Sequence, residues 1–172
     1  MISKLQAPSL ARRMASWLYE GMLVFGVLFV AGCTYFIIGG LLGTSSPNRS
    51  IKVDDPVLQA FLFVVLGIYF VWLWAKGQTL AMKTWDITVV DRSGQPITQT
   101  RALLRYLLSW IWFLPVLAAV APFHLSVAES VVIVVGWIVV WAELSRFHPQ
   151  RQFWHDALAG TWLISKPRSS KV

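Results

Sequence analysis

The chain has 172 residues, of which 56% are hydrophobic and only 13% are charged, and its mean hydropathy is +0.61. A soluble domain carries about 25% charged residues, so this composition excludes an ordinary soluble protein and favours one embedded in a membrane. The formal net charge is +7, but no nucleic-acid-binding motif accompanies it. We therefore interpret the basic excess as a sign of membrane topology and of contact with anionic headgroups, not nucleic acid.

Four apolar segments follow one another along the chain. They cover residues 17–42, 57–74, 102–121 and 125–144. A spanning helix needs ~20 residues to cross ~30 Å of hydrocarbon, so the second segment is short and the first is long enough to tilt. The first segment also exceeds the apolar core of a cleavable signal peptide. We expect an all-α membrane protein with four transmembrane helices.

Basic residues fall mainly on one of the two sides that these spans define. The amino-terminal tail, the loop between the second and third segments and the carboxy-terminal tail together hold 13 of the 15 Lys and Arg residues. The opposite side holds only Arg49 and Lys52, next to two aspartates. By the positive-inside rule both termini are cytoplasmic, and residues 122–124 form an external turn.

The loop between the second and third segments has a pattern of its own. Residues 87–90 are typical of a short strand, residues 91–94 of a turn, and residues 96–98 of a return strand. This pattern predicts a small cytoplasmic β-hairpin between helices two and three. Residues 77–85 are expected to form a short interfacial helix. Thr98 or Thr100 is expected to cap the third helix.

Glu20 occupies the most unusual position, because it lies a few residues inside the first apolar segment. A charge at mid-membrane costs about 2.5–3.5 kcal/mol on insertion scales, so Glu20 should face a partner or a water pocket. Arg13 lies on the same helix face, but a separation of seven positions corresponds to a rise of ~10.5 Å, too far for a direct ion pair. Candidate partners are Arg101, Arg105 and Arg146. Glu20 either locks helix packing through a buried ion pair or handles ions and protons.

The remaining polar residues give weaker signals. Glu129 and Glu143 lie near the two ends of the fourth segment, where headgroups would surround them. His148, His155 and Asp156 are too sparse to indicate a metal centre, so no metal or cofactor is predicted. The sequence contains no nucleophile elbow, Walker loop or HExxH motif. We therefore expect that the protein is not an enzyme.

Three separated patches resemble the RDD family of bacterial membrane proteins, which is named after one arginine and two aspartates. The first patch is the basic pair Arg12-Arg13 followed by Glu20, where the family usually has an aspartate. Either member of the basic pair could be the family's arginine. Glutamate in place of aspartate keeps the charge but lengthens the side chain.

The second and third patches lie further along the chain. Residues 77–105 resemble the family's glycine-threonine loop, short hairpin and helix entry, with Ala81 where glycine is usual. Residues 155–161 resemble its closing motif and make Asp156 the second aspartate. Order and spacing agree over nearly the whole chain.

The resemblance implies one RDD-like transmembrane domain over residues 8–164, with cytoplasmic tails at residues 1–7 and 165–172, in a bacterial inner membrane. Ligand transport is suggested for the family, and cation–proton exchange is reported for some members. The expected function is thus a small transporter or cation/proton exchanger that uses a membrane-embedded carboxylate, working as a homo-oligomer or in a larger complex. The alternative is a non-transporting membrane subunit, or an assembly or regulatory partner of another membrane complex.

The resemblance also links distant positions. Arg13, Glu20 and Asp156 all lie at the cytoplasmic boundary of the expected topology, so we expect them to meet there, with Arg105 or Arg101 nearby. Two carboxylates around one arginine would hold each other ionised. A proton or cation that competes with the arginine would make this cluster a switch.

Overall fold

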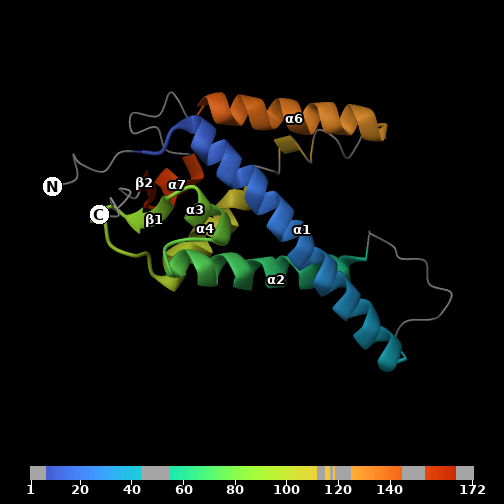
Figure 1. The fold of residues 1–172 in the computed structure, drawn as a ribbon. Helices are drawn as coiled ribbons and strands as arrows, with labels where there is room; N and C mark the ends of the chain where they lie inside the picture. The colour runs from blue at the N-terminus through green and yellow to red at the C-terminus, as the bar shows by residue number, and fades with distance from the viewer. Residues whose placement is uncertain are drawn as a thin grey trace.

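The computed structural model describes residues 7–43, 55–111, 115–116, 118, 125–144 and 154–165. Its helices and strands follow one another in the order shown in Figure 1: α1 (Leu10–Leu41), α2 (Pro56–Ala75), α3 (Leu80–Thr84), β1 (Ile87–Asp91), α4 (Gln99–Ile111), α6 (Val127–Leu144), α7 (Trp154–Leu158) and β2 (Thr161–Ser165). The short elements α3, β1, α7 and β2 gather where α1 begins and α2 ends (Figure 1).

Three helical segments are long and apolar enough to cross a membrane: α1, the segment Pro56–Thr84 that contains α2 and α3, and α6. This confirms the prediction of a mostly helical protein with apolar spanning segments. The third expected span, residues 102–121, is described as a continuous helix only in α4, and most of its second half lies outside the described residues. The external turn expected at residues 122–124 also lies outside them.

Side-chain caps fix where the first two long helices begin. Ser9 accepts a hydrogen bond from the backbone N–H of Arg12 at 3.4 Å, so α1 starts at Leu10, ahead of the apolar segment itself. Asp55 accepts one from the N–H of Val57 at 2.9 Å and is followed by Pro56 at the first helical position. Ser and Asp caps satisfy otherwise unpaired N–H groups, and Pro loses nothing there. The first two turns of α1 therefore include the polar residues Arg12, Arg13 and Ser16.

The β-hairpin prediction was wrong about the partner of the first strand. β1 pairs antiparallel with β2 near the carboxy terminus, with Ile87 opposite Ser165 and Asp91 opposite Thr161. Residues 96–98 form no strand and lead directly into α4, where the Thr98 hydroxyl accepts from the Arg101 N–H at 3.4 Å. Because Pro lacks an N–H and Thr98 caps a helix, this segment is poorly suited to return along β1.

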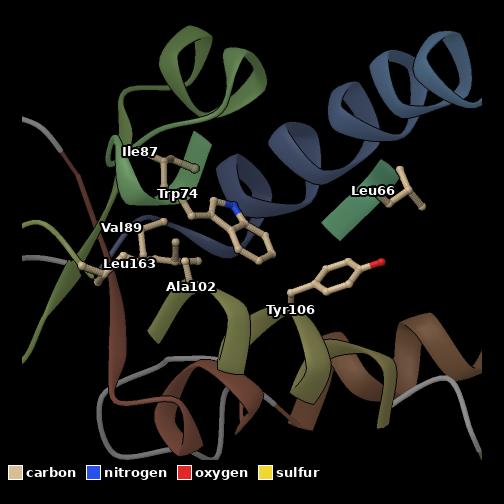
Figure 2. Packing of buried hydrophobic residues seen from close by; sticks show 8 residues of the cluster. Leu66, Trp74, Ile87, Val89, Ala102, Tyr106 and Leu163 are labelled. Carbon is tan, nitrogen blue, oxygen red and sulfur yellow. The ribbon is translucent and has the colours of Figure 1, made fainter. Parts of the chain in front are cut away.

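The apolar core lies where the sheet meets α2 and α4. Figure 2 shows Trp74 of α2 beside Ile87 and Val89 of β1, and the same cluster includes Tyr106 of α4 and Leu163 of β2. The core includes Ala102 and Tyr106 of α4, the helix that also carries Arg105. Burial is concentrated here, because most of the long helices' apolar residues are exposed on the protein surface, as expected for segments that face lipid.

Helices α2 and α4 approach closely at a glycine. A Cβ added to Gly67 would lie 3.2 Å from the Tyr106 ring, closer than an ordinary van der Waals contact. The Tyr106 hydroxyl donates to the carbonyl oxygen of Phe63, one turn earlier on α2, at 2.7 Å. The small residue and this hydrogen bond together position α4, and hence Arg105, against α2.

Candidate functional site

The first turns of α1 present a buried polar stripe. Arg13, Ser16 and Glu20 are spaced by three and four residues, so they lie on one helix face, and all three are buried. Most neighbouring side chains on α1 are exposed or half-buried. The polar face is therefore the one turned toward the protein interior.

Glu20 is held by hydroxyl groups from two other elements. Its Oε1 accepts from the Tyr69 hydroxyl of α2 at 2.8 Å, and its Oε2 accepts from the Thr79 hydroxyl in a short hydrogen bond. Thr79 also caps α3, where its oxygen accepts from the N–H of Met82 at 3.2 Å. Glu20 is 9% exposed, so the carboxylate is nearly enclosed by neutral partners.

The expected ion pair of Glu20 with an arginine is not seen among the described residues. Arg101 and Arg105 bind other carboxylates, and Arg146 lies outside the described part of the chain. The carboxylate of Glu20 thus sits next to groups that can donate a hydrogen bond but carry no charge.

Asp156 forms a buried ion pair with Arg105. The Arg105 Nε donates to Asp156 Oδ1 at 2.7 Å, and the two side chains are 4% and 0% exposed. The guanidinium also lies over the Trp74 ring, with Cζ 4.2 Å from the ring centroid. The Thr161 hydroxyl donates to the backbone oxygen of Asp156 at 3.2 Å. This pair joins α4 to α7, the short helix before β2.

Arg13 lies within electrostatic reach of Asp156. Asp156 is therefore attracted by two buried arginines, Arg13 from α1 and Arg105 from α4. The expected arrangement was the reverse, with two carboxylates around one arginine. The two arginines interact with Asp156, whereas Glu20 accepts hydrogen bonds from the hydroxyls of Tyr69 and Thr79.

The match to a known family decides what kind of protein carries this site. The RDD family matches residues 7–160, which is most of the chain. The chain belongs to the RDD family. Comparisons with curated proteins and with solved structures find no significant match. The membership predicted from the three sequence patches is confirmed, and with it the expectation of a membrane protein.

Arg101 lies apart from the other RDD candidate residues. Its Nη1 is 3.1 Å from Asp91 Oδ2, and its side chain is 49% exposed. The other oxygen of Asp91 accepts from the Ser93 hydroxyl at 2.5 Å and from the Gln95 N–H at 3.0 Å. The Ser93 hydroxyl, the Gln95 N–H and then Arg101 hold the pKa of Asp91 below its usual value. Arg101 thus stabilises the turn after β1.

Arg12 joins three elements of this RDD protein. It donates to the backbone oxygens of Trp85 and Asp86 and, at 3.3 Å, to the Ser165 hydroxyl. The two arginines of the basic pair therefore diverge: Arg12 contacts the α3–β1 turn and β2, while Arg13 turns into the interior.

Sequence reasoning missed two residues of the site. Thr79 lies in the patch that resembles the family's glycine-threonine loop. That pattern predicted a loop, but it did not identify Thr79 as a hydrogen-bond partner of Glu20. Tyr69 gave no signal, because one tyrosine in an apolar helix is usually a packing residue. Both contacts depend on how α1, α2 and α3 pack together.

Proposed function

We propose that this RDD family member is a small membrane transporter that exchanges a cation for a proton at Glu20. The observation that carries the proposal is that Glu20, a buried carboxylate, has two hydroxyl groups and no arginine as its partners among the described residues. A carboxylate locked to a guanidinium keeps its charge. One held by neutral hydroxyls can gain a proton and lose it again.

The atoms around Glu20 also suit a small hard cation. Its carboxylate and the hydroxyls of Tyr69 and Thr79 present oxygen atoms from three elements. Hard cations prefer oxygen ligands, and a carboxylate supplies the compensating charge. Proton and cation would compete for the same carboxylate, which is the requirement for exchange at a single site.

The proposed topology has four spans in a bacterial inner membrane with both termini cytoplasmic. Three candidate spanning helices and the concentration of basic residues on one side support it. In this topology the sheet, Arg105 and Asp156 lie at the cytoplasmic surface, and exposed basic residues of the central loop contact anionic headgroups. The few helices of one copy enclose little space, so a homo-oligomer is part of the proposal.

The test is a flux assay in proteoliposomes that compares the wild type with Glu20→Gln under sodium, potassium and pH gradients. The matched control is Glu129→Gln, which removes an exposed carboxylate on α6 whose described hydrogen bonds are those to the helix cap at Ser126. We expect wild type and Glu129→Gln to exchange ions and Glu20→Gln to fall to the level of empty liposomes. Equal flux from wild type and Glu20→Gln would contradict the role of Glu20. Background flux from the wild type under every gradient would count against exchange of these ions.

The alternative is a non-transporting subunit or an assembly or regulatory partner of another membrane complex. The exposed apolar surface of α6 favours it, because Ala142 is the one buried residue of that helix. A partner helix or a second copy could cover this surface. Mild crosslinking in native membranes, followed by identification of the crosslinked species, would distinguish a self-assembled transporter from a subunit of a larger complex.

A further inference from the structure

We infer that the two carboxylate oxygens of Glu20 have different roles, and that Tyr69 is the residue that controls access to the carboxylate. Thr79 fixes Oε2 in place, while Tyr69 covers Oε1, the oxygen at which a proton or cation enters and leaves. The inference rests on the proposed exchange at Glu20 and adds the residue that opens the site.

Thr79 is built into the structure as a rigid partner. It is 1% exposed, and its hydroxyl both donates to Glu20 Oε2 and accepts from the Met82 N–H at the start of α3. Two residues earlier, the Gly77 oxygen accepts from the Val89 N–H at 2.8 Å, which ties this segment to β1. Moving Thr79 away from Oε2 would therefore disturb the cap of α3 and threaten its contact with the sheet.

Tyr69 is attached less firmly. It is half-buried, and its hydroxyl makes one described hydrogen bond, to Glu20 Oε1 at 2.8 Å. Its ring packs edge-on against Phe70, its chain neighbour, with ring centroids 5.1 Å apart. A rotation of the Tyr69 side chain uncovers Oε1 without breaking a backbone hydrogen bond or a helix cap.

The two contacts therefore divide the carboxylate into a fixed side and an exchangeable side. The fixed side faces α3 and the sheet, and the exchangeable side faces α2. An entering proton that bonds to Oε1 needs only the Tyr69 hydroxyl to turn. A proton that bonds to Oε2 would have to turn away the buried Thr79 hydroxyl, which also caps α3.

The test measures how fast Glu20 reacts with a membrane-soluble carbodiimide, using the full-length protein purified in detergent. The carboxyl proton is transferred to a carbodiimide nitrogen while the carboxylate oxygen bonds to the central carbon, and the adduct rearranges to a stable N-acylurea that mass spectrometry detects. Nothing leaves, so the protein gains the mass of the reagent. Glu20→Gln shows which labelling belongs to this residue.

We expect Tyr69→Phe to label Glu20 about tenfold faster than the wild type, the effect of losing one hydrogen bond to a charged group. Thr79→Ser keeps the hydroxyl and should accelerate labelling much less than Tyr69→Phe does. The matched control is Tyr35→Phe, which removes a tyrosine hydroxyl bonded to Asp55 at 3.2 Å and should leave the rate unchanged. Thermal unfolding of each variant checks that faster labelling does not come from a loosened fold.

The inference is overturned if Tyr69→Phe labels at the wild-type rate, or if Thr79→Ser accelerates labelling and Tyr69→Phe does not. Labelling requires no ion movement, so this result is independent of the flux assay. Faster labelling of Tyr69→Phe without wild-type flux supports the division of the carboxylate and contradicts exchange. Wild-type flux without faster labelling supports exchange and contradicts the division.

Discussion

Arg105 and Asp156 are 51 residues apart in the sequence and form a buried hydrogen-bonded ion pair with an Nε–Oδ1 distance of 2.7 Å. The pair ties α4 to the short helix α7, which directly precedes β2. Trp74 covers the guanidinium from α2. Three parts of the chain that no local pattern connects are thus joined at one point.

Removing either partner of this pair should strongly destabilise the protein. Asp156→Ala leaves Arg105 charged and buried, and breaking a buried pair in this way costs about 3–5 kcal/mol. Chemical unfolding in detergent would measure the loss. Arg101→Ala is the control, because exposed pairs contribute only about 0–1 kcal/mol. A similar small loss for both variants would show that the buried pair is not a main support of the fold.

Gly67→Ala should separate α2 from α4. The added Cβ would lie 3.2 Å from the Tyr106 ring, and overpacking of this kind typically costs about 1–3 kcal/mol. Gly26→Ala is the matched control, because among the described residues no atom of another element lies within 4 Å of the position of its Cβ. Thermal unfolding of the two variants should differ clearly. A stable Gly67→Ala protein would mean that Tyr106 has room to move.

Arg12→Ala should loosen the α3–β1 turn and β2 while leaving the long helices intact. Arg12 donates to the Trp85 and Asp86 oxygens and to Ser165, so its loss frees both segments together. Hydrogen exchange followed by mass spectrometry should show faster exchange in both. Arg12→Lys should not restore protection, because one ammonium group cannot reproduce the several contacts of the planar guanidinium. Unchanged exchange in Arg12→Ala would contradict this role.

The turn after β1 should lose stability in acid. The Ser93 hydroxyl and the Gln95 N–H hold the pKa of Asp91 below its usual value. A carboxyl group whose pKa is lowered by folding stabilises the folded state above its unfolded pKa, ~3.9, and this contribution disappears as the pH falls through the folded pKa. Ser93→Ala should raise the Asp91 pKa toward its ordinary value, measured by NMR titration of the carboxyl carbon. An unchanged titration would show that the Ser93 hydroxyl is not the main cause.

Hydropathy predicted the spanning helices because it depends on composition over many residues. It could not predict the partner of β1, since residues 161–165 lie far away in the sequence and follow the last apolar segment like an ordinary tail. Their alternating burial exists only once β1 is beside them. Local turn signals at residues 91–98 favoured a hairpin. In the structure Thr98 instead caps α4, so the expected return strand does not form.

For the candidate residues too, the sequence predicted the general environment but not the specific partners. A buried role for Glu20 and a shared region for Arg13 and Asp156 followed from membrane energetics and the family pattern. The choice between Arg101 and Arg105 did not, because both are basic and open the same helix, four residues apart. Tertiary packing determines the partners: Arg105 forms an ion pair with Asp156, and Arg101 forms one with Asp91.

The pairing of β1 with β2 has a consequence for biosynthesis. The ribosome makes α1, α2 and α4 well before Asp156 and β2, so a nascent chain inserts its first helices while the Arg105 guanidinium and the edge of β1 still lack their final partners. The early helices therefore lack these contacts until Asp156 and β2 have been made. A chain that stops before Thr161 would leave the edge of β1 unpaired, and such an edge is a template for pairing with other chains.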